Sequence, residues 1–318
     1  MNQVAQFTPP HPLNTAVLFL VFNRLDSTKQ VFQAIRQAKP PRLYIAADGA
    51  RAKKEGEAEK VKAVRNYIMQ NIDWDCEVQT LFRDQNLGCK YAVSAAITWF
   101  FENEEQGIIL EDDCLPSQSF FWFCEELLEK YKDDESVYLV SGDSRGSESF
   151  GMKEDYGFCK YPMIWGWASW ARVWKNYDAE LQDWPEQRGG LPSSISSHKH
   201  TVVFWKKTFE RMYNKEIDTW DYQFSYLLLK NKAKCIVPRI NLITNVGFGE
   251  GATHTLSAES EAANRKRYEI KIPLTHTPKA ESEKKINDFY DRYEFLSKSL
   301  FVRVINKLSR LILGRNIY

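Results

Sequence analysis

The chain contains 318 residues, of which 43% are hydrophobic and 27% charged, a composition typical of an ordinary globular protein. Its formal net charge is only +1, so the composition provides no general attraction to nucleic acid. The six cysteines form no CxxC pair and no zinc-site spacing with histidine, which favours small buried thiols in a reducing compartment.

The N-terminal segment 1–14 has no basic stretch followed by an apolar one, so it does not resemble a signal peptide. The apolar run that follows, AVLFLVF, is too short to span a bilayer. We therefore predict a cytoplasmic protein that begins with a short N-terminal arm.

The first half of the chain then alternates between strand-like and helix-like segments. An unbroken apolar run at 15–22 predicts a strand that is buried on both faces. Further strands are predicted at 42–50, 76–84, 107–113 and 137–143, with helices between them at 23–38, 59–72, 86–102 and 117–131. This βαβ order predicts an α/β fold with a mostly parallel sheet that is flanked by helices.

The pattern changes after about residue 141. The segment 161–177 is aromatic and irregular before it turns helical, and 186–200 is polar and rich in Gly and Ser, which predicts a loop. Helices are predicted at 202–214 and 220–231, and a pair of strands within 233–246 leads into a glycine-rich loop. A long basic amphipathic helix is predicted over 284–313.

Polar side chains lie at the ends of three of the predicted strands, at the sheet edge where ligands bind in such folds. They are Asn23 and Arg24 directly after the first strand, Asp48 at the end of the second, and Glu111, Asp112 and Asp113 at the end of a later one. Three adjacent carboxylates repel one another unless a cation compensates them, and carboxylates suit Mg²⁺ or Mn²⁺ held together with phosphate oxygens. The sequence therefore indicates a site for a metal ion and a phosphorylated ligand.

Each of these residues also has a simpler interpretation. The carboxylates would be a solvated acidic loop, Asp48 would belong to an Asp-Gly turn, and Arg24 would be a surface arginine. The chain contains neither GxGxxG after the first strand nor GxxxxGK[ST]. Dinucleotide oxidoreductases and P-loop NTPases are therefore not expected.

Together these features resemble GT-A glycosyltransferases, and more closely the inverting enzymes of glycosyltransferase family 13, the N-acetylglucosaminyltransferase I type, with their bacterial relatives. The resemblance covers roughly residues 15–260 through short motifs in a consistent order. The motifs are FNRLDSTKQV, AADG, GCKYAVSAAITWFF, ILEDDCLPSQSFFWF, WGWASWARVW, TWDYQFSYLLLKN and ITNVGFGEGATHT. The resemblance implies a GT-A fold, which is a Rossmann-like mixed sheet flanked by helices.

For the nucleotide-sugar donor, the resemblance implies roles at the strand ends. Asn23 and Arg24 would contact the nucleotide, and Asp48 would bind the uracil. Lys90 would lie beside the base, at a position where the family has a histidine. This difference from the family weakens the implied preference for uracil as the base of the donor. Asp113 would ligate Mn²⁺ or Mg²⁺. Its neighbours Glu111 and Asp112 would orient the waters of the metal ion or contact the sugar.

For the chemical step, the resemblance makes Asp221 the catalytic base that deprotonates the acceptor hydroxyl. Its alternative role is that of a helix cap, because Asp is frequent at helix N-termini. Thr253 and His254 in the glycine-rich loop would contact the diphosphate, and His254 would be a further metal ligand; otherwise the loop would be a flexible surface loop.

Trp165, Trp167 and Trp220 lie in the most tryptophan-rich part of the chain. They would form a stacking platform for donor or acceptor sugars, or else they would fill the core.

We predict four segments along the chain: an arm (1–14), a nucleotide-sugar-binding half (15–140), an acceptor-binding and catalytic half (141–275), and a C-terminal amphipathic helix (280–318). The basic face of this helix suits contact with an anionic membrane, and packing on protein is the alternative.

The predicted function is an inverting, metal-dependent glycosyltransferase that moves a sugar from a nucleotide-diphosphate sugar, with UDP as the expected nucleotide, to a glycan or lipid-linked acceptor. Such an enzyme would serve the biosynthesis of a surface polysaccharide or glycoconjugate in a bacterium. The alternatives are a sugar-nucleotide-binding module without catalysis and a sugar-phosphate nucleotidyltransferase.

Overall fold

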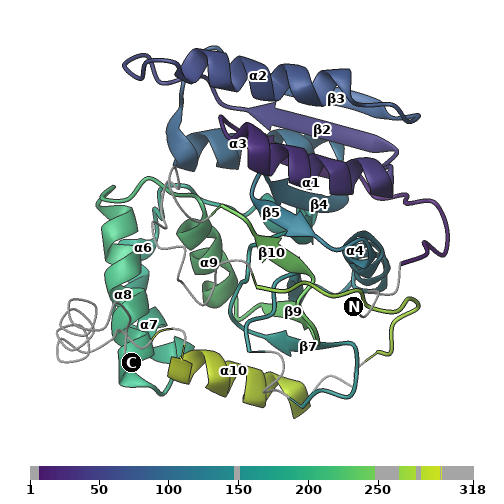
Figure 1. Cartoon of the computed structure of the whole chain (residues 1–318). Helices are drawn as coiled ribbons and strands as arrows, with labels where there is room; N and C mark the ends of the chain where they lie inside the picture. Colours follow the sequence, from purple (N-terminus) through teal and green to yellow (C-terminus); the bar gives the residue numbers. More distant parts are fainter. Residues whose placement is uncertain (1–6, 147–150, 248–264, 277–280, 294, 296–318) are drawn as a thin grey trace, which may run out of the picture.

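The computed structural model describes residues 7–146, 151–247, 265–276, 281–293 and 295. Its centre is an eight-stranded mixed sheet in the order β3-β2-β1-β4-β8-β6-β9-β7, next to a two-stranded sheet of β5 and β10 (Figure 1). The strands are β1 (Val17–Val21), β2 (Arg42–Ala47), β3 (Glu77–Phe82), β4 (Gln106–Glu111), β5 (Cys114–Pro116), β6 (Val137–Ser141), β7 (Tyr156–Cys159), β8 (Trp167–Trp170), β9 (Lys234–Pro238) and β10 (Ile243–Asn245).

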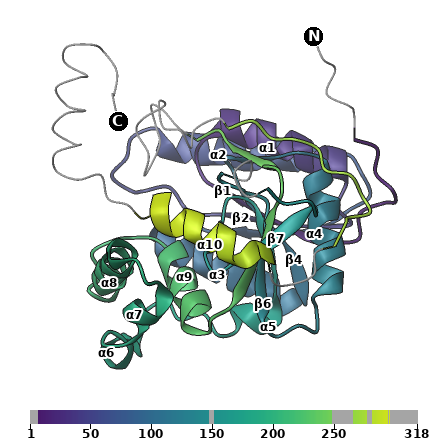
Figure 2. The ribbon, with the colours of Figure 1, turned by 90° about the horizontal axis from the view of Figure 1, so that it is seen from below.

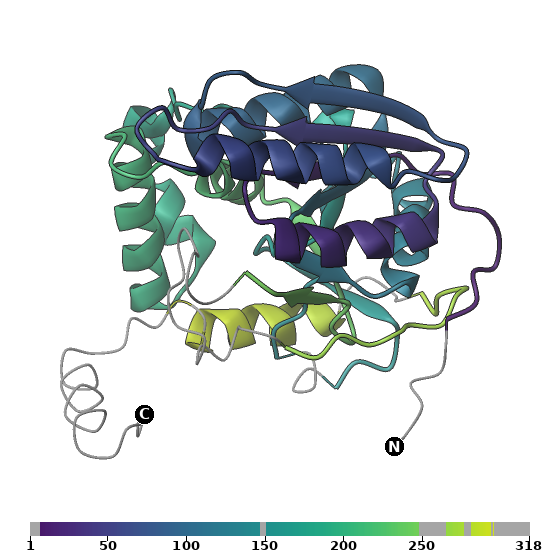
Figure 3. The ribbon, with the colours of Figure 1, turned by 45° about the horizontal axis from the view of Figure 1, so that its top comes forward.

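The helices connect these strands in the order expected for an α/β protein. They are α1 (Leu25–Ala38), α2 (Glu57–Gln70), α3 (Gly88–Asn103), α4 (Ser119–Lys130), α5 (Ala171–Trp174), α6 (Trp184–Gln187), α7 (Leu191–Ile195), α8 (Lys199–Tyr213), α9 (Asp221–Lys230) and α10 (Glu281–Tyr293). Helices α1 and α2 lie side by side on one face of the sheet, and α3 covers the other face (Figure 3).

The first four strands run parallel to one another, as the sequence predicts. All five residues of β1 are buried, because the strand lies in the middle of the parallel part with helices on both faces. Strands β6 and β9 continue in the same direction, whereas β7 and β8 run antiparallel to their neighbours. The predicted fold class, a mostly parallel mixed sheet flanked by helices, is confirmed.

The structure differs from the prediction in three places. Strand β5 in the first half and strands β7 and β8 in the second half were not expected, and β8 lies in the segment predicted to be irregular. The two strands within 233–246 do not pair with each other, because β9 joins the large sheet and β10 pairs with β5. The loop predicted at 186–200 contains the short helix α7 and the end of α6.

Strand β8 lies between β4 and β6, so one sheet runs through both predicted halves of the chain. The predicted division of the chain into a donor-binding half that ends at residue 140 and an acceptor-binding half that begins at residue 141 stays a prediction.

Helix α10 packs across β7 on the lower side of the molecule (Figure 2). Its Ile286 and Tyr290 are fully buried, so this part of the predicted C-terminal helix packs on its own chain. The described part of this helix runs to Tyr293, and the prediction of one helix over 284–313 stays a prediction beyond that residue. Residues 296–318 lie outside the described residues. Among the helices that are described, none combines the length and the apolar character that a bilayer crossing requires.

Candidate active site

A cavity of about 670 Å³ lies at the carboxyl ends of β1, β2 and β4, a volume in the usual range for small-molecule sites. Most of the residues predicted for the site line this cavity. They are Asn23, Arg24, Asp48, Glu111, Asp112, Asp113, Trp165, Trp220 and Asp221. Lys90 and Trp167 are not among the lining residues, and Thr253 and His254 lie outside the described residues.

Arg24 connects the carboxylates that follow β4. It occupies the N-cap position of α1, and its side chain is about 29% exposed. Its Nη2 atom donates to Asp112 Oδ1 at 2.7 Å and lies 2.9 Å from Asp113 Oδ2. The backbone amide of Phe22 also donates to Asp112 Oδ2, at 3.3 Å. The end of β1 thus holds the acidic end of β4 in place.

Burial raises the pKa of Glu111, and the negative charges of Asp113, Asp112 and Asp221 raise it further. Burial also raises the pKa of Asp112, although the charge of Arg24 opposes this shift. Burial and the charges of Glu111, Asp218 and Asp221 likewise raise the pKa of the Cys89 thiol to about 12. Cys89, Glu111 and Asp221 are distant in the sequence and all line this cavity.

The charges that line the cavity are unbalanced. Six carboxyl groups and three guanidinium groups line it, with no lysine among the described lining residues. A dianionic diphosphate would be repelled by such a site unless a further cation were present.

These carboxylates suit a divalent cation by their oxygen chemistry. However, no group of three or more His, Cys, Asp or Glu residues in the described part of the chain could hold a metal ion by itself. Arg24 already pairs with Asp112 and Asp113. The donor set therefore fits a cation held by one carboxylate, with Asp113 as the predicted ligand, and by the phosphates of a bound ligand.

Asp48 lines the cavity, but its carboxylate is already occupied by nearby donors. It accepts hydrogen bonds from the backbone amides of Gly49 (2.9 Å) and Leu87 (3.0 Å). The amide of Gly88 and the side chain of Asn86 also donate to it. Asp48 thus joins the end of β2 to the start of α3. This geometry favours the structural alternative for Asp48 over the predicted contact with uracil.

Lys90 is buried at only 6% exposure, and its Nζ donates to Glu180 Oε1 at 2.7 Å. Tyr91 donates to the same carboxylate, and Lys215 pairs with its other oxygen. The structure therefore places the Lys90 side chain in an ion pair beside α3, and this position favours a structural role over contact with the donor.

Asp221 is the first residue of α9, where the helix dipole favours a negative charge. Thr219 Oγ1 donates a short hydrogen bond to its carboxylate. Trp220 precedes it, lines the cavity and stacks on the fully buried Trp167 with ring centroids 5.7 Å apart. Trp167 thus takes the core-filling alternative and supports Trp220 from behind. Asp221 shares the cavity with the carboxylates that follow β4.

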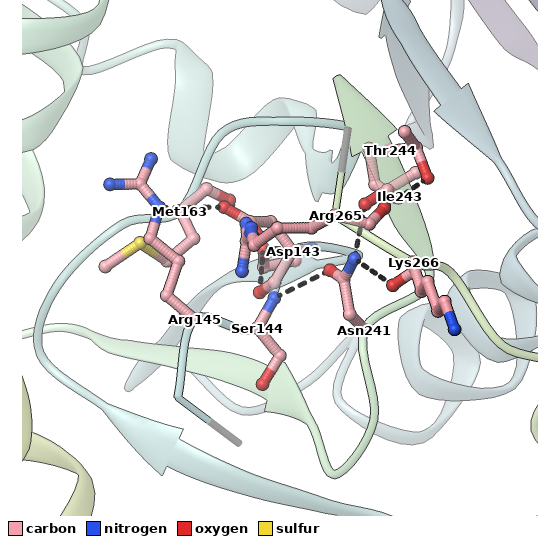
Figure 4. A network of polar contacts seen from close by, with 10 residues as sticks. Asp143, Ser144, Arg145, Met163, Asn241, Ile243, Thr244, Arg265 and Lys266 are labelled. Atoms are coloured by element: carbon pink, nitrogen blue, oxygen red, sulfur yellow. Dashed lines mark hydrogen bonds and ion pairs between the residues drawn. The ribbon is translucent and has the colours of Figure 1, made fainter. Parts of the chain in front are cut away.

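Trp165 also lines the cavity, and two arginines flank its ring (Figure 4 shows the polar network that holds them). The guanidinium carbon atoms of Arg145 and Arg265 lie 4.6 and 5.8 Å from the ring centroid. Both arginines pair with Asp143, which is fully buried. Asn241 binds the carbonyl of Lys266 and the amide of Ser144. The network therefore holds the two arginines against the ring of Trp165 in the lining of the cavity.

The sequence alone did not identify several groups at this site. Arg51, Arg83, Asn86 and Asp218 line the cavity. Glu57 lies behind the lining at 1% exposure and binds both Asn23 and Arg51. The proximity of Arg51 and Arg83 to strand ends was a usable signal. Nothing in the charged run around Glu57 marks it as a buried residue.

No protein-family model and no curated protein matches this sequence. Solved structures show a weak likeness. The galactosyltransferase LgtC in complex with donor and acceptor sugar analogs is 11% identical with a TM-score of 0.34, over 91% of this chain and 99% of that one. UDP-glucose pyrophosphorylase complexed with UDP-glucose is 10% identical with a TM-score of 0.35, over 71% and 90%.

The glycosyltransferase GlyE from Streptococcus pneumoniae TIGR4 is 11% identical with a TM-score of 0.31, over 72% of this chain and 55% of that one. Similarity at this level carries no argument about function, which has to be inferred from the geometry of the cavity.

Proposed function

We propose that this protein is a glycosyltransferase that moves a sugar from a nucleotide-diphosphate sugar to a hydroxyl group of an acceptor. The observation that carries the proposal is the shared position of Asp221 and the carboxylates that follow β4. They line one cavity at the carboxyl ends of parallel strands, where α/β folds bind nucleotides.

In this proposal Asp221 takes the proton of the acceptor hydroxyl. The oxygen then attacks the anomeric carbon of the donor sugar while the bond from that carbon to the diphosphate breaks. The nucleoside diphosphate leaves with both bonding electrons, and attack from the opposite side inverts the configuration. Thr219 supports this role, because its hydrogen bond orients the Asp221 carboxylate.

The other wall of the cavity would hold the donor. Arg24 and Asp113 line the cavity and would contact the diphosphate, and the half-buried Trp165 would offer aromatic surface to a sugar ring. Trp220 is only 2% exposed, so it would mainly support the wall of the cavity. A divalent cation at Asp113 would neutralise the charge of the leaving group. The carboxylate excess of the cavity supports a need for such a cation. The proposed donor is a UDP-sugar and the proposed acceptor a glycan or lipid-linked glycan.

The first test measures the melting temperature of the purified protein with UDP-, GDP-, dTDP- and CMP-sugars, each with and without Mn²⁺. Ligand binding to the folded state raises the melting temperature. We expect a shift with one class of donor that requires metal and is lost in Asp113→Ala. If no donor shifts the melting temperature, the protein does not use nucleotide sugars and the proposal is wrong.

The second test separates an enzyme from a binding module. It measures release of nucleoside diphosphate from the bound donor, with water or simple sugars as acceptors. Asp221→Asn should keep donor binding and lower the release roughly a hundredfold or more. Asp26→Asn, a change of the same kind at an exposed position on α1, should leave it unaltered.

Equal release by Asp221→Asn and the wild type would exclude Asp221 as the base. Formation of a nucleotide sugar from a nucleoside triphosphate and a sugar 1-phosphate, with release of pyrophosphate, would identify a nucleotidyltransferase instead.

A further inference from the structure

Glu57 is a buried acid whose carboxylate binds two residues of the cavity lining, Asn23 and Arg51. It is the first residue of α2 and is only 1% exposed. One carboxylate oxygen accepts a hydrogen bond from Asn23 Nδ2 at 2.9 Å, and the other accepts the Arg51 backbone amide at 2.8 Å. The Arg51 guanidinium also binds this carboxylate through Nε and Nη2. Asn23 and Arg51 line the cavity and come from different strand ends.

The carboxylate of Glu57 fixes the orientation of the Asn23 amide. Arg51 lowers the pKa of Glu57 to about 2, so the group is ionised near neutral pH. An ionised carboxylate only accepts hydrogen bonds, and therefore the Asn23 amide must present its NH₂ group to Glu57. Its oxygen, Oδ1, remains as the acceptor of this side chain, and among the described residues no hydrogen bond to it is found.

Arg51 adds donors next to this acceptor. Its guanidinium lies over the ring of Phe22, with the carbon atom 5.6 Å from the ring centroid, and Phe22 lines the cavity as well. Glu57 uses Nε and Nη2 of Arg51, and a guanidinium carries five N–H donors in total. The cavity wall thus combines one fixed acceptor, N–H donors and an aromatic face. Asp48, which the family resemblance assigns to the base, is already satisfied by backbone amides.

We propose that Glu57 is a specificity-determining positioning residue, which holds Asn23 Oδ1 as an acceptor for a ring N–H of the donor nucleobase. Uracil, thymine and guanine carry a ring N–H between a carbonyl group and a second polar group on their pairing edge. Cytosine and adenine carry an acceptor nitrogen at the equivalent place. This nitrogen would face Asn23 Oδ1, and because both atoms are acceptors, no hydrogen bond would form between them. This inference rests on the proposed use of a nucleotide sugar and assigns the class of base that the site selects.

The test compares dissociation constants for UDP, dTDP, GDP, CDP and ADP, measured by calorimetry with Mn²⁺ present. We expect the wild type to bind one of UDP, dTDP and GDP at least roughly tenfold more tightly than CDP and ADP, because two opposed acceptors lose a hydrogen bond and leave both atoms unsatisfied. Glu57→Gln should lower this ratio to about threefold or less, because a glutamine accepts or donates and lets the Asn23 amide turn over.

Asn23→Ala provides a second variant that leaves the pair of Glu57 and Arg51 intact. It should lower the same ratio even if Glu57→Gln folds poorly. Glu59→Gln is the matched control, because Glu59 is exposed on the same helix and should keep the wild-type ratio. A purely structural role of Glu57 would weaken all nucleotides equally and leave the ratio unchanged.

The outcomes distinguish this inference from the proposed function. If the wild type prefers CDP or ADP, or if both variants keep the wild-type ratio, the inference is wrong while the proposed function stands. If no nucleotide binds to the wild type, both are wrong.

Discussion

Gly247 lies directly against the carboxylate of Asp113. A Cβ atom at position 247 would lie 2.2 Å from Asp113 Oδ2 and 2.8 Å from Arg24 Nη1. Gly247 follows β10, and the amide of Val246 donates to the Asp113 carbonyl oxygen at 2.8 Å. The small sheet of β5 and β10 therefore closes over the acidic end of β4, and only a glycine leaves the ion pair of Arg24 and Asp113 undisturbed.

Gly247→Ala should displace the side chains of Asp113 and Arg24 and weaken donor binding by roughly tenfold or more, as measured by calorimetry. The atoms that the new methyl group would meet belong to the side chains of Asp113 and Arg24, which can shift. The free energy of unfolding should therefore fall by only about 1–3 kcal/mol. Gly189→Ala is the control, since a Cβ at 189 meets nothing within 4 Å. Equal donor affinity in the two variants would show that the close approach at Gly247 does not matter for binding.

Arg24→Gln removes the positive charge that joins Asp112 and Asp113. Because Arg24 and a metal ion compete for the same carboxylates, Mn²⁺ alone should bind the variant more tightly than the wild type, by roughly tenfold. Calorimetry with Mn²⁺ in the absence of a donor measures this. The gain should disappear in the double variant Arg24→Gln, Asp113→Asn. Identical Mn²⁺ affinity in the wild type and Arg24→Gln would exclude a metal site at these carboxylates.

Glu180→Gln tests the structural role of Lys90. Hydrogen bonds from Lys90, Tyr91 and Lys215 lower the pKa of Glu180 from 4.5 to about 2. A folded-state pKa below the unfolded value stabilises the fold above about pH 4.5, and this stabilisation is lost as the pH falls toward about 2. Allowing for the 33% exposure of Glu180, the variant should lose about 1–2 kcal/mol at pH 7.

Urea unfolding of the wild type and Glu180→Gln at pH 7, 4 and 3 measures this difference, which should shrink steadily with falling pH. A difference that stays constant over this range would mean that the charge of Glu180 does not stabilise the fold.

Asp143→Asn removes a fully buried charge that pairs with Arg145 and Arg265. Loss of one partner of a buried ion pair leaves the other charge uncompensated, so the free energy of unfolding should fall by about 3 kcal/mol. Asp73→Asn breaks the exposed pair with Arg36 and should lower the free energy of unfolding far less. Chemical denaturation measures both variants. Equal small losses would show that the network beside Trp165 contributes little to stability.

Local patterns in the sequence were enough to predict the parallel half of the fold. The apolar run at 15–22 predicted a strand buried on both faces, and the alternation of strands with amphipathic helices implied a parallel sheet. Because the carboxyl ends of parallel strands meet at one edge, Asn23, Arg24 and Asp113 could be placed at a common site before any contact was known.

The tertiary structure decided the features that depend on residues distant in the sequence. Strand β8 is irregular by local pattern and forms because it adds to β4 and β6. Trp165 and Trp167 are two residues apart, yet Trp165 lines the cavity and Trp167 fills the core. Lys90 faces Glu180, and Glu57 joins Asn23 to Arg51.

The physical reason is that hydrophobic periodicity in the sequence shows which face of a helix or strand is buried. The residue that a given side chain contacts depends instead on the path of the whole chain. Hydrophobic burial is non-directional, so a local pattern indicates that a side chain is buried but not what it contacts. Hydrogen bonds and ion pairs require a particular partner at a particular distance. The sequence by itself therefore determined the sheet edge at which the candidate site lies, and the tertiary structure decided which of its side chains are already occupied by partners within the protein.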